Sequence, residues 1–276
     1  MRSVLYAPGH NSRALAKAPT TATDAVIFDL EDAVAPAAKA MARQQVLAAL
    51  QASKDCRTVR AVRINGLQSG GWREDLATVL PGRPDVIVVP KVESTIELDA
   101  VTQYTGPLPL WAMIESPLGV LQAAAIATHP QVTALIPGTS DLSERLHVDI
   151  HHDRTPLLWV LQQLVLVARA ADIQIIDGVF LDLNDTDGLR RQCEEALRWG
   201  FDGKTLIHPS QIAAANTVFT PSAEVIARAR RLLEAWDSAA AGGEAICLLD
   251  GRLIEQLHAR DAARVLALWQ RIDAKQ

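Results

Sequence analysis

Residues 108–141 read LPLWAMIESPLGVLQAAAIATHPQVTALIPGTSD, and this stretch shows the unit from which the fold is built. It contains two short apolar runs, LPLWAMIES from Leu108 and VTALIPGTSD from Val132, which suit buried strands. The residues between them read as a helix. Two strands joined in this way form a parallel βαβ unit. The strands end in polar residues, Glu115 and Asp141.

The same pattern recurs along the chain. The other apolar runs are VLYAPG from Val4, AVIFDLED from Ala25, VRAVRIN from Val59, VIVVPKVE from Val86, IQIIDGVF from Ile173 and GKTLIHP from Gly203. Helical periods separate them, as in KAMARQQVLAALQA from Lys39 and in DTDGLRRQCEEALRWG from Asp185, which ends at Gly200. Eight such units predict an α/β protein with a closed (β/α)8 TIM barrel, and 276 residues suit one such domain.

Composition agrees with this class. Hydrophobic residues make up 49% of the chain and aromatic residues only 4%, which suits packed helices and parallel strands better than a β-sandwich. The formal net charge is −5 and the sequence pI is about 5.8, so no general basic field attracts a nucleic acid or an anionic membrane. We therefore expect no nucleic-acid or membrane partner, and any anionic ligand must be bound by local groups.

The cysteines and the apolar segments indicate the cellular compartment of the protein. Cys56, Cys193 and Cys247 are odd in number and far apart, which argues against a disulfide framework or a structural zinc site. The most apolar stretch, residues 157–168, contains two glutamines and is too short to span a bilayer. No basic-then-apolar leader opens the sequence. We expect a soluble, cytoplasmic protein.

The C-terminal part differs from the barrel units. A helix over residues 221–236 is followed by the small-residue segment SAAAGG from Ser238, which reads as a flexible linker. The apolar segment after it is too short to fold alone. We predict a barrel over residues 1–237 and a helical arm or lid over 238–276, which packs on its own barrel or covers the mouth of its own or a neighbouring barrel.

Polar residues gather where the predicted strands end, at the end of the barrel that we call the mouth. Barrels of this class carry their chemistry there. Glu115 and Asp141 end adjacent strands, so their carboxylates form an oxygen site that suits Mg²⁺, with Mn²⁺ as a substitute. The alternative is that each carboxylate pairs with a barrel lysine or arginine.

Arg63 lies in an apolar strand and needs an anion, because an unpaired buried guanidinium is costly. Its position favours a substrate oxygen, while a salt bridge to Glu31 or Asp32 is the alternative. We assign Glu31 and Asp32 with Arg63 to substrate binding. Lys91 could form a Schiff base, but beside so many acidic residues a charged structural lysine is the safer interpretation.

The histidines give weaker signals. His151, His152 and Asp153 lie in a polar loop without the spacing of a helical metal-binding pair, so we expect them to be solvent-exposed. His208 ends the eighth predicted strand, where it could act as a base or simply satisfy local hydrogen bonds.

A series of motifs resembles one known family over nearly the whole chain. The motifs are RSVLYAPGHNSRALAKA at Arg2, FDLEDAV at Phe28 with Lys39 and AR at Ala42, VRIN at Val62, PKVES at Pro90, MIESP at Met113, GTSDL at Gly138, DGV at Asp177, GFDGKTLIHPSQI at Gly200 and DGRLIE at Asp250. Together they resemble the citrate lyase β-subunit-like, or HpcH/HpaI aldolase/citrate lyase, family.

The resemblance implies a barrel that binds a CoA thioester, with magnesium at Glu115 and Asp141 and the thioester at Arg63. It further implies CoA phosphates near Arg13 and Lys17, and homo-oligomers, commonly trimers or hexamers. In malyl-CoA-lyase-like members a tail carboxylate, matched here by Glu255, reaches a neighbouring subunit's site.

At two positions the sequence differs from the family pattern in a way that bears on the identity of the substrate. Ser116 stands where many members have threonine, and Glu255 stands where malyl-CoA-lyase-like members have aspartate. The longer Glu255 side chain changes the geometry of an acid/base group. This substitution leaves the identity of the acyl group in the substrate undetermined.

These implications define an expected activity. It is a magnesium-dependent lyase that makes or breaks a carbon–carbon bond in a citramalyl-, malyl- or citryl-CoA type thioester, giving acetyl-CoA and a 2-oxo acid. Arg63 and Glu255 are the expected catalytic residues. The alternatives are a malyl-CoA-type thioesterase, a metal-dependent aldolase for a free hydroxy acid, and a non-catalytic assembly subunit.

Overall fold

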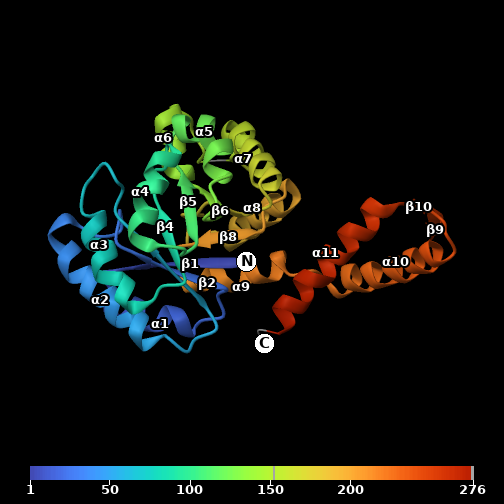
Figure 1. Ribbon diagram of the computed structural model, residues 1–276, viewed down its shortest axis with the longest axis horizontal. Helices are drawn as coiled ribbons and strands as arrows, with labels where there is room; N and C mark the ends of the chain where they lie inside the picture. The colour runs from blue at the N-terminus through green and yellow to red at the C-terminus, as the bar shows by residue number, and fades with distance from the viewer. Residues whose placement is uncertain (152, 275–276) are drawn as a thin grey trace. The chain divides into compact units, whose positions relative to one another are not determined.

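A closed barrel of eight parallel strands forms the first part of the protein. The structure is a computed structural model and describes residues 1–151 and 153–274. The strands are β1 (Ser3–Pro8), β2 (Ala25–Asp29), β3 (Val59–Arg63), β4 (Val86–Val89), β5 (Leu110–Ile114), β6 (Val132–Pro137), β7 (Gln174–Asp177) and β8 (Gly203–Leu206). β1 pairs with both β2 and β8, which closes the barrel (Figure 1). The predicted (β/α)8 fold is confirmed.

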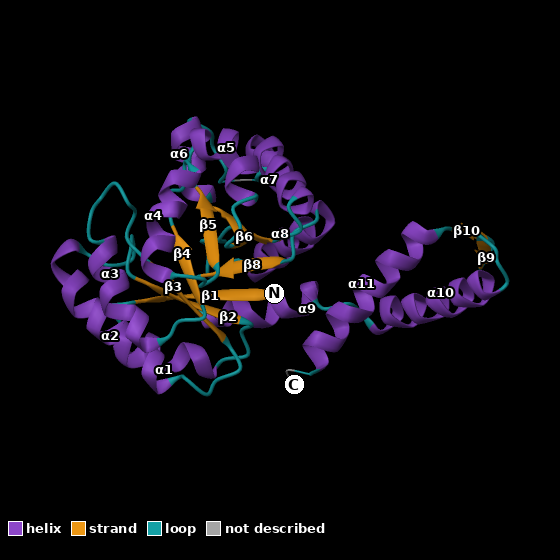
Figure 2. Ribbon diagram, in the orientation of Figure 1, coloured by secondary structure: helices purple, strands orange, loops and turns teal. Residues whose placement is uncertain are grey.

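Helices surround these strands, as Figure 2 shows in purple around the orange barrel. They are α1 (Ser12–Lys17), α2 (Lys39–Ala52), α3 (Trp72–Val79), α4 (Thr95–Thr105), α5 (Pro117–Ala127), α6 (Thr139–Leu146), α7 (Leu158–Ala170), α8 (Thr186–Trp199) and α9 (Ile212–Phe219). Within the described residues, no helix has both the length and the apolarity needed to cross a membrane.

Local sequence explains several helix boundaries. Asp185 caps α8 by accepting a hydrogen bond from the Gly188 amide, and Gly200 ends the helix in the left-handed region with φ 100°. Ser116 caps α5 in the same way by accepting from the Gly119 amide. Because serine and threonine both cap helices well, the serine at position 116 is compatible with the same local structure.

Strand alternation separates two buried layers. Inside the barrel, side chains such as Val4, Ile27 and Trp111 form one apolar cluster. Residues of the opposite parity, such as Leu5 and Phe28, pack outward against the helices. Tyr6 and Met113 follow the inward parity and approach the mouth, where the polar side chains begin.

The C-terminal residues form a second compact unit, Thr220–Gln276, so the division falls after Phe219 and not after residue 237 as expected. α10 (Ala223–Ala241) runs through Ser238 and all three alanines of the SAAAGG segment. The linker prediction is wrong for those residues, because alanine favours a helix more strongly than any other residue.

Beyond α10 the unit contains a hairpin and a long helix. The elements are β9 (Cys247–Leu249), β10 (Arg252–Ile254) and α11 (Gln256–Asp273). Asp250 and Gly251 make the turn with φ values of 51° and 74°, the conformation that favours Asp-Gly in tight hairpins. α10 and α11 pack together through a small apolar cluster that includes Leu232, Ile254 and Ala259.

Candidate active site

A cavity of about 380 Å³ opens at the mouth of the barrel. Four of its lining side chains were predicted site residues: Asp32, Arg63, Glu115 and Asp141. The other lining residues are Tyr6, Pro8, Asp29, Ala33, Met113, Ile136, Pro137, Gly138, Thr139, Ser140, Val179, Thr205 and Ile207. The barrel therefore brings a guanidinium and several carboxylates to one cavity.

Arg63 is held by a partner that the sequence analysis did not select. Asp29 faces Arg63 across the β2–β3 pairing, and its two carboxylate oxygens accept hydrogen bonds from Arg63 Nε at 2.7 Å and Nη2 at 2.6 Å. Burial opposes ionisation of Asp29, but Arg63 outweighs it and lowers the pKa of that carboxyl. This forked contact sets the orientation of the guanidinium.

Glu31 forms a second ion pair with Arg63, as the salt-bridge alternative anticipated. Arg63 Nη1 lies 2.8 Å from Glu31 Oε2, although that oxygen accepts no hydrogen bond within the described structure. Burial raises the pKa of Glu31, and Arg63 and Lys91 oppose the shift. Asp32 does not pair with Arg63 in the described structure; its carboxylate lies 3.1 Å from Lys91 Nζ.

Lys91 behaves as a charged lysine. Its ammonium donates to Glu31 Oε1 at 2.6 Å, and although burial alone would lower its pKa, the hydrogen bonds to Glu31 and Asp32 raise it. A Schiff-base lysine needs the opposite shift, because the neutral amine is the nucleophile. The structural interpretation of Lys91 is therefore the better one.

Lys39, which accompanies the FDLEDAV motif, stabilises the loop that follows β2. Its ammonium donates to the backbone oxygens of Leu30 at 2.7 Å and Glu31 at 2.6 Å. These two contacts hold the loop between β2 and α2, which carries Glu31 and Asp32 to the mouth.

Glu115 is an acid of the cavity whose pKa is raised by burial. Its side chain is 2% exposed, and burial raises its pKa to about 8, with further contributions from Glu31 and Asp141. The Lys91 amide donates to Glu115 Oε2 at 2.8 Å. A Cβ at position 138 would overlap the carboxylate, so Gly138 makes room for it.

The donor set fits a hard divalent cation. Asp141 lies in the first turn of α6, lines the same cavity as Glu115 and acts electrostatically on it. A cation would relieve the cost of ionising the buried Glu115. Among the described residues no group of three or more His, Cys, Asp or Glu side chains could hold a metal. Two protein carboxylates leave room for substrate oxygens and waters, as Mg²⁺ commonly requires.

Tyr6 and Met113 were also missed by sequence reasoning. The Arg63 guanidinium lies over the Tyr6 ring, 5.0 Å from its centroid, and the Tyr6 hydroxyl donates to Met113 Sδ at 3.7 Å. Burial raises the pKa of Tyr6 well above its usual value, partly opposed by Arg63. Tyr6 lies in a strand motif, so its residue type alone gave no signal of a site.

The histidines lie apart from these groups. His208 Nδ1 is 2.8 Å from Ser210 Oγ and takes part in a local cap, which supports the interpretation as a satisfied histidine. His151 and Asp153 are exposed, and His152 lies outside the described residues. None of the described histidines lines the cavity.

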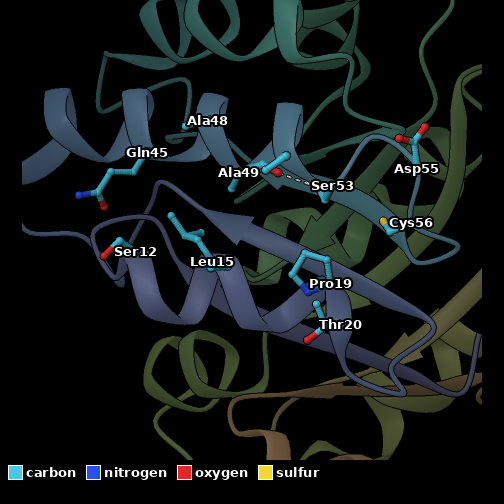
Figure 3. Close-up of a pocket in the computed structure, with 12 residues that line it drawn as sticks. Ser12, Leu15, Pro19, Thr20, Gln45, Ala48, Ala49, Ser53, Asp55 and Cys56 are labelled. Carbon is cyan, nitrogen blue, oxygen red and sulfur yellow. Dashed lines mark hydrogen bonds between the residues drawn. The ribbon is translucent and has the colours of Figure 1, made fainter.

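Arg13 and Lys17 are exposed on α1 and do not line the mouth cavity. Beside them, a second cavity of about 450 Å³ lies between α1 and α2. Figure 3 shows Ser12, Leu15 and Pro19 on one side of it and small α2 side chains such as Ala49 on the other.

Glu255 belongs to the second unit. There it occupies the N-cap position of α11 in a reciprocal capping arrangement with His258, whose Nδ1 accepts from the Glu255 amide at 3.0 Å. The DGRLIE motif therefore builds the hairpin turn and the start of α11.

The closed parallel barrel and the acidic, arginine-containing cavity at its mouth define a (β/α)8-barrel enzyme. The chain belongs to the HpcH/HpaI aldolase/citrate lyase family, whose sequence profile matches residues 2–209. The resemblance drawn from the motifs is thereby confirmed.

Three relatives illustrate the range of the family. A (3S)-malyl-CoA thioesterase of Cereibacter sphaeroides is 44% identical over 273 residues, covering 99% of this chain and 96% of the relative. An L-malyl-CoA/β-methylmalyl-CoA lyase of the same species is 32% identical over 304 residues, covering 99% and 96%. The Mycobacterium tuberculosis protein CitE, crystallised with magnesium, acetoacetate and coenzyme A, is 28% identical with a TM-score of 0.80, covering 98% of this chain and 100% of CitE.

Proposed function

We propose that this chain is a magnesium-dependent enzyme that cleaves, or forms, a carbon–carbon bond in a short β-hydroxyacyl-CoA thioester of the malyl-CoA type. The observation that carries the proposal is that Arg63 and the carboxylates Glu115 and Asp141 line one cavity. Arg63 supplies a cation for the thioester oxygen, and Glu115 and Asp141 supply carboxylate oxygens for a metal ion. A β-hydroxyacyl thioester has a thioester oxygen for the cation, and carboxylate and hydroxyl oxygens for the metal.

The reaction would divide the acyl chain between these two regions. Magnesium held by Glu115 and Asp141 would polarise the carboxylate and hydroxyl oxygens of the acid portion. The hydroxyl would lose its proton as its oxygen becomes the carbonyl of the 2-oxo acid. The bond between the hydroxyl-bearing carbon and the adjacent carbon would break at the same time, its electron pair moving toward the thioester, and the proton lost is balanced by the one later added to carbon. Arg63, oriented by Asp29, would stabilise the resulting enolate oxygen in a partly dry cavity. Protonation on carbon then gives acetyl-CoA beside a 2-oxo acid.

Five further residues complete the proposal. Glu255, from a neighbouring copy in a homotrimer or hexamer, would exchange the proton on the enolate carbon. Arg13 and Lys17 are exposed cations on α1 and would contact CoA phosphates. Asp32 at the edge of the cavity would position the substrate, and Glu31 would do so through Arg63 and Lys91.

Hydrolysis of the thioester is the second candidate. A malyl-CoA thioesterase aligns with this chain at 44% identity, compared with 32% for the malyl-CoA lyase. The same site serves both reactions, because attack of water on the thioester also places negative charge on the acyl oxygen beside Arg63. An aldolase acting on free hydroxy acids would need neither the thioester nor the cations on α1.

Product analysis tests these assignments. The purified chain with Mg²⁺ is incubated separately with malyl-, citramalyl- and citryl-CoA and with the free hydroxy acids, and 2-oxo acid and free thiol are measured in parallel. A lyase releases 2-oxo acid without thiol, whereas a thioesterase releases thiol without 2-oxo acid. Turnover of the free acids supports the aldolase alternative. An absence of turnover with all three thioesters contradicts the proposal.

A further inference from the structure

Two strong hydrogen-bond donors point at one weak acceptor inside the mouth cavity. The Tyr6 hydroxyl lies 3.7 Å from Met113 Sδ, and Arg63 Nη1 lies 4.0 Å from the same sulfur. Tyr6 belongs to β1, Arg63 to β3 and Met113 to β5, so barrel closure brings the three together. All three side chains line the cavity.

A thioether is a poor partner for these donors. Methionine sulfur is a weak acceptor, whereas a phenol and a guanidinium are among the stronger donors of proteins. Within the described residues, the sulfur is the only hydrogen-bond acceptor found for the Tyr6 hydroxyl. A donor left with such a partner in an enclosed site gains most from an oxygen atom, above all a charged one.

The rest of the Arg63 guanidinium is already committed. Nε and Nη2 donate to the two oxygens of Asp29, and this fork leaves Nη1 directed toward the sulfur and Glu31. The Tyr6 ring packs under the guanidinium, 5.0 Å from ring centroid to Cζ. Tyr6 and Arg63 therefore hold each other in place while Nη1 and the hydroxyl face the same point.

We infer that Tyr6 is a catalytic residue whose hydroxyl, paired with Arg63 Nη1, forms a two-donor oxyanion site for the thioester oxygen. The inference rests on the proposed CoA-thioester function but not on the choice between cleavage and hydrolysis. In cleavage the oxygen becomes an enolate, and in hydrolysis it becomes the oxyanion of a tetrahedral intermediate. Both place the negative charge where the two donors converge.

The protonation state of Tyr6 suits this role. Burial keeps the phenol neutral, so its proton remains available for donation and is not transferred. Tyr6 neither forms nor breaks a covalent bond in the reaction. Its contribution is to strengthen one hydrogen bond as charge develops on the acyl oxygen, which lowers the barrier without stabilising the bound substrate equally.

Tyr6→Phe is the decisive variant, because it keeps the ring and its contact with Arg63 and removes only the hydroxyl. We expect kcat on a thioester substrate to fall on the order of 10²-fold, as for loss of one oxyanion donor, while KM changes by less than about threefold. Tyr104→Phe is the matched control, since Tyr104 is the other tyrosine of the chain and its hydroxyl accepts from Arg73 at the surface. It should leave both constants unchanged.

A binding experiment gives a readout that needs no turnover. Carboxymethyl-CoA is a stable thioether with an anionic group near the position of the enolate oxygen, and S-ethyl-CoA is its neutral counterpart. By titration calorimetry with Mg²⁺, the wild type should bind carboxymethyl-CoA more tightly than S-ethyl-CoA. Tyr6→Phe should reduce that preference about tenfold or more, the range for a hydrogen bond to a charged group, without weakening S-ethyl-CoA.

The outcomes separate this inference from the proposed function. An unchanged preference in Tyr6→Phe, or no preference in the wild type, overturns the oxyanion site. A reduced preference in a protein that turns over no thioester supports the site and contradicts the proposed function. Met113→Leu removes the sulfur and keeps both donors. If it lowers kcat as much as Tyr6→Phe does, the hydroxyl serves only to contact the sulfur, and the inference is wrong.

Discussion

Asp29→Asn tests whether one buried ion pair both stabilises the barrel and orients Arg63, the proposed catalytic cation. Asp29 is 1% exposed and accepts two hydrogen bonds from Arg63, at 2.7 and 2.6 Å. Breaking a buried pair of this kind costs about 3–5 kcal/mol, because the remaining charge stays buried. Asparagine keeps one acceptor and Glu31 lies 2.8 Å from Arg63 Nη1, so we expect the lower end, about 3 kcal/mol.

Thermal and chemical denaturation measure this loss. For a domain of this size about 3 kcal/mol corresponds to a fall in Tm of roughly 6–12 °C. The effect depends on pH in a defined direction. The folded pKa of Asp29 is lowered from its ordinary value of 3.8, so its stabilisation is present above that value and is lost as the pH falls through the folded pKa. The difference from wild type should be constant near neutral pH and shrink below about pH 4.

Asp24→Asn provides a matched control. Asp24 forms a similar buried pair with Arg2, at 2.9 Å between Oδ1 and Nη2, but it precedes β2 and lies at the opposite end of the strand from Asp29. Both variants should lose stability, and only Asp29→Asn should lose turnover, on the order of 10²-fold through a misplaced guanidinium. Equal turnover in the two variants, or a stability loss for Asp29→Asn below about 0.5 kcal/mol, would refute the reasoning.

Four further results are expected. Arg63→Lys should lower kcat on the order of a hundredfold and raise KM little, since lysine keeps the charge and loses the fork; a near-normal kcat with weaker binding would make Arg63 a binding contact only. A chelator should abolish turnover, and Mg²⁺ or Mn²⁺ should restore it; full activity in metal-free buffer contradicts a metal at Glu115 and Asp141. Because the folded pKa of Glu115 is raised to about 8, the metal-free protein should lose stability as the pH rises toward 8 while its apparent affinity for Mg²⁺ increases, and Glu115→Gln should flatten both trends. Co-expression of Glu255→Ala with Arg63→Ala should restore part of the activity that each lacks alone, and mixed oligomers without such recovery would exclude a shared site.

The barrel could be predicted because its signal is local and repeated. Eight apolar runs recur along residues 4–209, and each strand of the barrel lies inside one of them to within one residue. The α2 and α8 helices likewise match their predicted segments, because a helical period, and in α8 also the Asp185 cap and Gly200, is encoded by residues close together in the sequence. The hairpin turn at Asp250 and Gly251 was equally readable, but the motif around it was interpreted only for function.

The site was predictable in part. Arg63 was selected because a charge inside an apolar strand is conspicuous, and Glu115 and Asp141 because they follow adjacent strands; the structure places all three in the lining of one cavity. Asp29 was missed because FDLED offers three acids within four residues, and the sequence does not show which one faces Arg63. The pairing register decides it, since Asp29 and Arg63 are direct partners between β2 and β3.

The amino-acid sequence alone established the eight-stranded barrel, the end that carries the polar residues and the family, because periodicity, helix capping and motifs are properties of neighbouring residues. The tertiary structure alone decided how those polar residues combine. Tyr6, Arg63 and Met113 are separated by 57 and 50 residues, yet they meet because β1, β3 and β5 point alternate side chains into one closed barrel. The convergence of two donors on one sulfur is a property of that closure, and no local pattern encodes it.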